Sequence, residues 1–325
     1  MQNRRLPSPT GELLISIRLS IYAAAAAVAG LLATGPVHAE TAPLPVTEIA
    51  PGVFVHNGVH EEATAANDDA IANVGFVIGD NAVAVIDPGG SFREGAALRA
   101  AIRARTDRRI GYVILTHVHP DHIFGAAAFG PDHPDFVGHA KLPGALAQRG
   151  KYYLRRLREA LGAAADATEL VAPTVLVSDR LELDLGGRRL ALQAHEPAHT
   201  DNDLTVFDEN TRTFWLADLL FVDRIPVIDG SVVGWLKELH QLTRIPADRA
   251  VPGHGPVWVP WPAAADPERR YLEAVERDTR AAIRAGIGIA DAYREVAKSE
   301  RGRWLLFDEY HPRNVTASYK ELEWE

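Results

Sequence analysis

The chain lacks cysteine altogether and has no excess of positive charge. None of its 325 residues is Cys, so disulfide bonds cannot stabilise it. Its formal net charge of −9 at pH 7 argues against nucleic acid or an anionic membrane as its main partner. The composition, 47% hydrophobic and 24% charged, is that of a globular protein. We therefore expect the fold to depend on its hydrophobic core and on any bound metal.

The sequence also lacks an apolar run of the ~20 residues that a membrane-spanning helix needs. Residues 1–39 instead predict a secretory signal peptide, with three arginines, a short apolar core at 19–33 and a small-x-small cleavage site at 37–39. The Arg4-Arg5 pair leaves a twin-arginine export route open. We expect a periplasmic or secreted protein with no stable membrane insertion after cleavage, and an uncleaved anchor is the alternative.

Three histidines and one aspartate follow directly after a predicted buried strand at 112–115. In extended chain, His117 and His119 lie on the same side and can bind one cation. The proline that follows cannot continue a strand, so Asp121 and His122 are turned toward a neighbouring point. The motif predicts ligands for two metal ions roughly 3.5–4 Å apart, as in two-metal hydrolases. A cluster of unpaired histidines buried without metal would be costly.

Four further residues of metal-binding type lie at the ends of predicted strands or just beyond them. They are Asp87, His199, Asp218 and His254. Asp87 has two interpretations. It belongs to a turn before a helix capped by Ser91, or its carboxylate orients metal-binding histidines from outside the ligand set. Because strand ends meet at one edge of a sheet, the repeated placement predicts one shared site.

These residues resemble the metallo-β-lactamase superfamily over residues 48–260. The resemblance rests on the HxHxDH element at 117–122 and on the order and spacing of the other four residues. It implies an αβ/βα four-layer sandwich of two mixed β-sheets with outer helices. The implied organisation is a catalytic domain at 40–265 and a helical extension at 266–325, packed on the same domain.

The resemblance implies a dinuclear metal site. The implied ligands are His117, His119 and His199 for one metal, and Asp121, His122 and His254 for the other, with Asp218 bridging both. Such ligands suit two Zn²⁺ ions, and they also suit iron or manganese. The implied activity is hydrolysis of a carbonyl-type bond (ester, lactone, thioester or amide) in a small-molecule substrate by a metal-bridging hydroxide. Asp121 and Asp218 are the implied catalytic residues, and Asp87 would support the ligands.

Several details resemble the quinoprotein relay system zinc metallohydrolases more narrowly. They are the segments 73–76, 86–91, 116–125, 137–139 and 313–321. This resemblance implies a partner, a periplasmic quinoprotein dehydrogenase system. Two alternatives remain open: an iron-dependent sulfur or oxygen redox enzyme on the same fold, and a non-catalytic metal-binding periplasmic accessory protein. Cysteine-using β-lactamases have Cys at the position of Asp218, so this chain departs from that class.

Three other segments carry expectations. A helix should begin at 123–129, with the positive end of its dipole beside the site. A second helix, at 141–163, carries a basic run at 149–156 that we expect to be a solvated face. The connection 57–73 is long for a hairpin, which is typical of a binding loop or of disorder, and His56 and His60 beside it are candidates for substrate contact.

Overall fold

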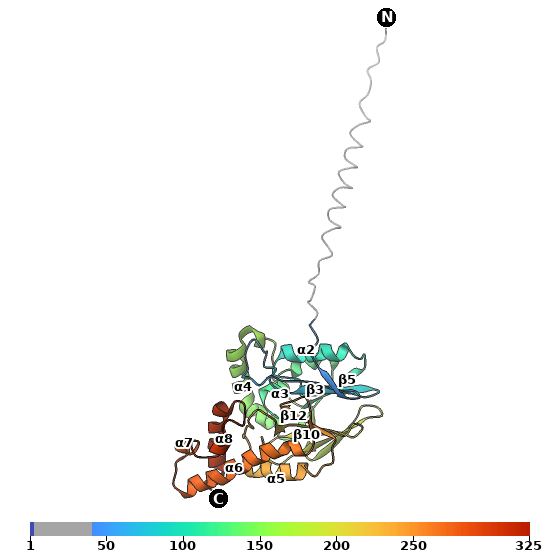
Figure 1. The fold of residues 1–325 in the computed structure, drawn as a ribbon. Coiled ribbons are helices and arrows are strands. Elements are labelled where there is room, and N and C mark those ends of the chain that lie inside the picture. The colour runs from blue at the N-terminus through green and yellow to red at the C-terminus, as the bar shows by residue number, and fades with distance from the viewer. Residues whose placement is uncertain (3–40) are drawn as a thin grey trace. The chain divides into compact units, whose positions relative to one another are not determined.

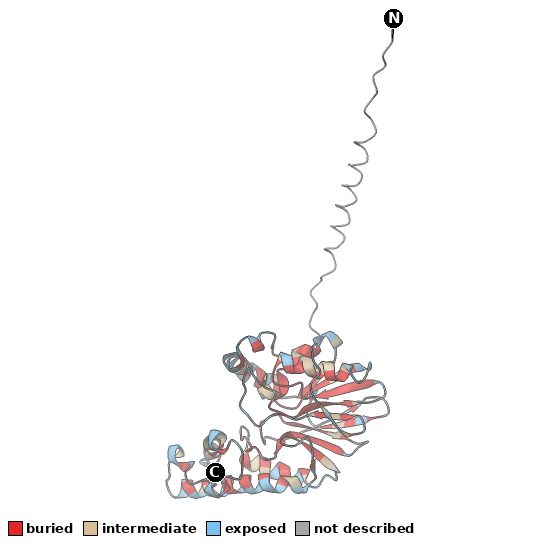
Figure 2. Ribbon diagram, turned by 45° about the horizontal axis from the view of Figure 1, so that its top comes forward, coloured by how far each residue is buried: buried red, intermediate tan, exposed pale blue. Residues whose placement is uncertain are grey.

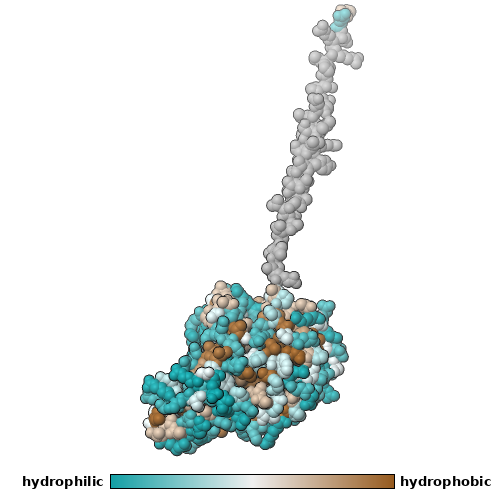
Figure 3. Space-filling model, in the orientation of Figure 1, coloured by the Kyte–Doolittle hydropathy of each residue, from teal (hydrophilic) through white to brown (hydrophobic). Residues whose placement is uncertain are grey.

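The structure, a computed structural model, describes residues 41–325 and the first two residues. Apart from Met1 and Gln2, the predicted signal peptide lies outside the described residues. Residues 42–325 form one compact unit (Figure 1). Among the described residues, no helix has the length and apolar character that crossing a bilayer would require. The face of the unit in Figure 3 is largely hydrophilic, with apolar side chains between the polar ones.

Two mixed β-sheets form the centre of this unit. The seven-stranded sheet has the order β1-β2-β3-β4-β5-β6-β7, and the six-stranded sheet has the order β13-β12-β11-β10-β9-β8. The strands of the first sheet are β1 Thr47–Ala50, β2 Val53–His56, β3 Val74–Ile78, β4 Ala82–Ile86, β5 Arg109–Leu115, β6 Asp135–His139 and β7 Val175–Val177. Those of the second are β8 Arg180–Asp184, β9 Arg189–Ala194, β10 Leu204–Asp208, β11 Thr213–Phe221, β12 Arg249–His254 and β13 Val259–Pro260.

Helices cover the outer faces of both sheets. The longer helices are α2 Phe92–Arg103, α4 Leu142–Leu161, α5 Val232–Leu242, α6 Asp266–Arg284 and α8 Phe307–Leu322. The short elements are α3 Pro120–Ile123, α7 Ile289–Ala292, η1 Ala126–Asp132, η2 Gly162–Ala165, η3 Ala263–Ala265 and η4 Lys298–Glu300. Each longer helix buries one face against the rest of the unit and exposes the other (Figure 2). The predicted αβ/βα sandwich of two mixed sheets is confirmed.

The expected helix at 123–129 differs in the structure. A short helix, α3, begins at Pro120, because a proline at the first helical position has a suitable φ and needs no hydrogen-bond partner for its nitrogen. It ends at Ile123, and the chain continues into a 3₁₀ segment. Gly125 explains this break, since its N–H donates to Gly89 O at 2.7 Å and a Cβ there would collide with Pro88 O. The two ligand candidates at 121 and 122 therefore lie inside the short helix.

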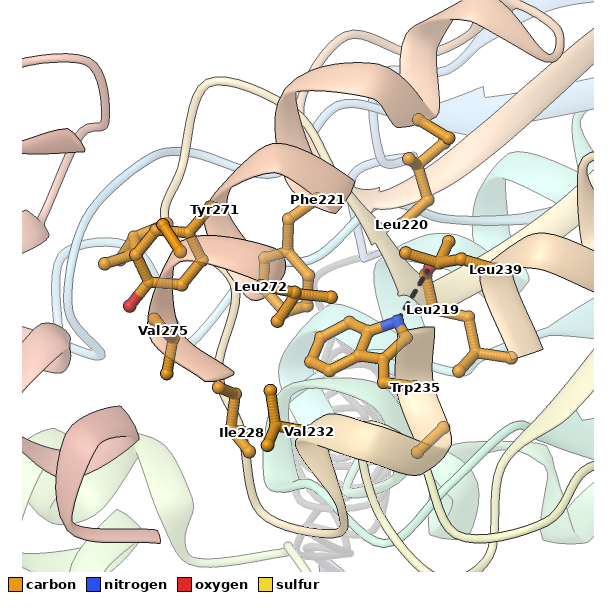
Figure 4. Packing of buried hydrophobic residues seen from close by; sticks show 14 of the residues in the cluster. Leu219, Leu220, Phe221, Ile228, Val232, Trp235, Leu239, Tyr271, Leu272 and Val275 are labelled. Atoms are coloured by element: carbon orange, nitrogen blue, oxygen red, sulfur yellow. Dashed lines mark hydrogen bonds between the residues drawn. The ribbon is translucent and has the colours of Figure 1, made fainter. Parts of the chain in front are cut away.

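Three hydrophobic clusters hold the layers together. The central one lies between the sheets and includes Trp215 and Ile86, while two others lie under the outer helices. β4 and β11 are buried along their whole length, which explains why β4 is a continuous apolar run and why β11 is apolar apart from Thr213 and Asp218. Figure 4 shows the cluster under α5 and α6, where Trp235 donates its Nε1–H to Leu219 O at 3.4 Å.

The C-terminal helices share this last cluster. Tyr271 and Leu272 of α6 and Val315 of α8 pack with Phe221 of β11 and Trp235 of α5, all almost fully buried. Residues 266–325 thus complete the hydrophobic layer that covers the second sheet. This layer lies directly behind β11, which carries one of the predicted metal ligands.

We expect Trp215→Ala to lower the free energy of unfolding by about 3–5 kcal/mol, because it removes a large buried side chain from between the sheets. Urea unfolding followed by circular dichroism measures this change. Trp324→Ala is the matched control, since Trp324 is 85% exposed; its change should stay within about 0.5 kcal/mol. Equal losses in the two variants would contradict the assignment of Trp215 to the core.

Candidate metal centre

The predicted metal ligands come from loops and strand ends of both sheets. The chain leaves β5 at Leu115 and enters the segment that contains His117 to His122. His254 is the last residue of β12, and His199 lies between β9 and β10. Because parallel strands end at the same edge, elements far apart in sequence deliver their side chains to one place.

Asp218 reaches the centre from inside β11 rather than from a strand end. The pairing of β11 with β12 shifts register around it, between Ala217 and Phe221, and Ala217 has a positive φ of 45°. Such an irregularity re-aims a side chain. Gly253 on β12 leaves room for it, because a Cβ at that position would collide with Asp218 Oδ1.

The structure brings all seven predicted ligands together in two groups. The first group is His117, His119, His199 and Asp218, and the second is Asp121, His122 and His254. Within each group, the candidate ligand atoms all lie within 4.8 Å of one another. In the first group, His119 Nδ1 is 2.8 Å from His199 Nε2. In the second, Asp121 Oδ2 is 3.3 Å from His254 Nε2.

The Asp218 carboxylate lies between the two groups. Its Oδ2 is 3.3 Å from His199 Nε2 on one side and 3.5 Å from His254 Nε2 on the other. Its Oδ1 is 3.0 Å from His122 Nε2. One carboxylate therefore reaches both groups, which is the arrangement that a bridging ligand requires.

The residues fit a pair of metal ions. His117 Nε2 is buried and has no hydrogen-bond partner in the described part of the chain, and the 3.0 Å contact between His122 Nε2 and Asp218 Oδ1 does not have the geometry of a hydrogen bond. Buried polar atoms are normally paired, and unpaired ones cost free energy. Here the unpaired atoms are ligand atoms of the two groups. Imidazole nitrogens and carboxylate oxygens are suitable ligands for zinc and also for iron or manganese.

The protonation of the histidines suits ligation. Burial lowers the pKa of His199 to about 3, and burial with the charge of His122 holds the pKa of His117 well below its usual value. Both are therefore neutral near pH 7, as metal ligation requires. Burial alone would lower the pKa of His122, but the surrounding carboxylates, Asp218 foremost, raise it well above its usual value. The carboxylates around His122 therefore favour a positive charge at this position.

Asp87 holds one ligand histidine on its outward side. Its Oδ2 accepts from His122 Nδ1 at 2.8 Å, which is the contact expected of a carboxylate that orients a ligand. The same carboxylate accepts from the backbone N–H and the hydroxyl of Thr116, at 2.9 and 2.8 Å. Ser91 also caps α2, where its hydroxyl accepts from Glu94 N. Both interpretations of the segment after β4 therefore describe real contacts.

The loop 57–73 supports a second ligand histidine. His254 Nδ1 lies 2.8 Å from Ile71 O. A backbone carbonyl of this loop thus supports His254 in the way that a carboxylate supports His122. Such a contact fixes which ring nitrogen is left for the metal. The connection 57–73 thus helps to orient a ligand histidine of the centre.

Sequence reasoning missed Asp229 and was wrong about Arg149. His119 Nε2 lies 3.2 Å from Asp229 Oδ2, and the Arg149 guanidinium binds the same oxygen. The expectation that the whole basic run 149–156 is a solvated face is therefore wrong for Arg149, which turns toward the site. Lys151 and Arg155 are exposed as expected. No spacing rule connects Asp229 to His119, because the two are 110 residues apart.

His60 lies near the centre, as the position of its loop suggests. Its pKa is lowered by burial and by the positive charges of His254 and Arg224, and its Nδ1 is buried without a hydrogen-bond partner among the described residues. His56, the last residue of β2 just before this connection, has a structural contact instead, between its Nδ1 and Pro45 O at 2.7 Å.

We expect Asp87→Asn to weaken metal binding at the group of Asp121, His122 and His254 by roughly 10- to 100-fold, because His122 loses its carboxylate partner. Competition with a chromophoric chelator measures the affinity. Asp80→Asn, which changes an exposed carboxylate, should leave it unchanged. An Asp87→Asn protein with unaltered affinity would contradict the orienting contact.

Comparisons with known proteins agree with this geometry. A family model for the metallo-beta-lactamase superfamily matches residues 67–254, more than half of the chain and a range that contains all seven ligands. The chain is 25% identical over 258 residues to the 2,4-dinitroanisole O-demethylase subunit alpha of Nocardioides sp., covering 76% of this chain and 73% of that protein. It is also 25% identical over 234 residues to the linear primary-alkylsulfatase of Pseudomonas sp.. That match covers 61% of this chain and only 43% of the alkylsulfatase.

Solved structures share the fold. The sec-alkylsulfatase PisA1 of Pseudomonas sp. aligns with a TM-score of 0.66 at 17% identity, covering 86% of this chain and 50% of that one. A metallo-beta-lactamase from Pontibacter korlensis aligns with a TM-score of 0.57 at 18% identity, covering 71% of this chain and 99% of that one. With the family match and the two His/Asp groups, the chain belongs to the metallo-beta-lactamase superfamily as a metal-dependent hydrolase.

Proposed function

We propose that the chain is an exported dinuclear zinc hydrolase that cleaves a carbonyl-type bond in a small molecule. The observation that carries the proposal is the Asp218 carboxylate, which lies within 3.5 Å of histidine nitrogens from both groups. A shared carboxylate lets two cations sit close together, because its negative charge offsets their repulsion. A single-metal site would not need this arrangement.

The proposed ligands are those that the resemblance implied. His117, His119 and His199 would hold one ion, Asp121, His122 and His254 would hold the other, and Asp218 would be shared between them. When bound, the zinc pair supplies a water that is acidic near neutral pH and polarises the bond to be cleaved. Asp121, whose Oδ2 lies 3.3 Å from His254 Nε2, would be the residue that carries a proton toward the leaving group. Asp87 and Asp229 keep His122 and His119 in their orientations.

The substrate proposal has two candidates. The first is an ester, lactone, thioester or amide, as expected from the hydrolytic chemistry of the metal pair. The second is an alkyl sulfate ester or an aryl ether, because two relatives are named as an alkylsulfatase and a dinitroanisole O-demethylase subunit. A panel of these bonds, with a β-lactam included, separates the candidates.

Export and a quinoprotein dehydrogenase partner are also part of the proposal. Export is supported by the signal-like pattern of residues 1–39, and the partner by the five short segments that resemble the relay-system proteins. Cell fractionation tests the location. Co-purification with a quinone-dependent dehydrogenase from cells grown on alcohols tests the partner.

We expect His119→Ala and Asp121→Ala to lower kcat/KM on the best substrate by at least about 100-fold, because each removes a ligand and Asp121 also a proton carrier. Circular dichroism should show that both variants keep the fold. His133→Ala, which changes an exposed histidine outside the centre, is the control. Unchanged turnover in either ligand variant would refute its role.

Metal analysis of protein purified without added metal accompanies this test. Two zinc ions per chain are the expected result. Iron in their place would favour the redox alternative, and bound metal without turnover on any bond of the panel would favour an accessory protein.

A further inference from the structure

The loop 225–231, between β11 and α5, makes the outer contacts of two ligand histidines. Val227 O accepts from His199 Nδ1 at 2.7 Å, and Asp229 Oδ2 lies 3.2 Å from His119 Nε2. Asp229 N also donates to His199 O at 2.9 Å. Both histidines belong to the first group of ligands. The geometry of that group therefore depends on where this loop lies.

The loop has no helix or strand of its own to fix it. Two residues of α8, 86 to 90 residues further along the chain, bind it, in addition to the backbone bonds from Ile225 N to Leu305 O and from Ser231 N to Ala198 O. Asn314 Nδ2 donates to Pro226 O at 2.6 Å, and Asn314 Oδ1 accepts from Ile228 N at 3.0 Å. The two bonds fall on either side of Val227, the residue whose carbonyl holds His199. Asn314 is fully buried, so water does not compete for them.

A second residue of α8 fixes the other end of the loop. Glu321 Oε2 accepts from Val232 N at 2.8 Å, and Glu321 Oε1 accepts from the Ser231 hydroxyl. Ser231 is the N-cap of α5, so this contact also fixes where α5 begins. The loop is thus held at both ends by one helix, which lies beyond the residues 67–254 that the family model matches.

We propose that α8 is part of the metal centre, and that Asn314 is a positioning residue for the ion held by His117, His119 and His199. The proposal rests on the proposed function, in that it needs this group to bind metal. Asn314 fixes the Val227 carbonyl, this carbonyl keeps the proton of His199 on Nδ1, and Nε2 is left free as a ligand. The second group of ligands has no contact with the loop in this network.

The test compares zinc affinity in two single-site backgrounds. His254→Ala leaves only the first group intact, and His199→Ala leaves only the second. Asn314→Asp keeps the acceptor for Ile228 N and loses the donor to Pro226 O. We expect it to weaken zinc binding about 10-fold in the His254→Ala background and to leave it unchanged in the His199→Ala background. Chelator competition measures the affinity without any assay of activity.

Tyr271→Phe is the matched control. The Tyr271 hydroxyl accepts from Asn314 Nδ2 at 2.9 Å in the same buried network, but it does not contact the loop. Both Asn314→Asp and Tyr271→Phe should lower the free energy of unfolding, and only Asn314→Asp should lower the affinity of the first group. Asn314→Ala, which loses every bond, should act in the same direction and more strongly.

Three results would overturn the proposal: unaltered zinc affinity in both Asn314 variants, an equal loss in the two backgrounds, or the same loss in Tyr271→Phe. A failure of the proposed function gives a different result. In that case the chain without any substitution binds fewer than two zinc ions.

Discussion

A single carboxylate determines how the centre is organised. Asp218 is the point where the two groups of ligands meet, and each group alone could hold only one ion. Burial would raise the pKa of this carboxyl, but the surrounding histidines, His122 first among them, hold it well below its usual value. The carboxylate therefore stays ionised inside the protein. Its fixed negative charge would allow two positive ions to be neighbours in a buried site.

The fold produces this geometry because elements of both sheets place their ligand residues at one edge of the sandwich. The first sheet delivers the His117–His122 segment, the second delivers Asp218 and His254, and the loop between β9 and β10 delivers His199. The outer contacts come from still other elements: Asp87 after β4, Ile71 in the loop 57–73, and Val227 and Asp229 before α5. Because these supports are spread over most of the chain, the centre can form only when nearly all of the fold is in place.

The fold and the clustering of the candidate ligands could be predicted because both leave signals in residue type and spacing. Histidines two apart after an apolar strand point to one side, and burying them without a metal would be costly. The fully buried strand β4 is a continuous apolar run, and β11 is apolar apart from Thr213 and Asp218, which the sequence shows directly. The supports of the ligands leave no such signal. Val227 and Ile71 act through backbone carbonyls, which every residue has.

The remaining residues that support the ligands could not be predicted, because they are far from their partners in the sequence. Asp229 lies 110 residues from His119, and Asn314 lies 88 residues from Pro226, so only tertiary structure brings them to their partners. Arg149 could not be assigned for a different reason. Its position on a helix does not show which neighbour so long a side chain reaches.

Gly253 has a consequence for how the metal centre could be changed. The hydrogen atom that it carries in place of a side chain is what leaves space for the Asp218 oxygen. A library that diversifies the surroundings of the metal centre can vary residues of the nearby loops, but any other amino acid at 253 would push the Asp218 carboxylate aside. In a redesign of specificity, the smallest residue on β12 is therefore the one to leave untouched.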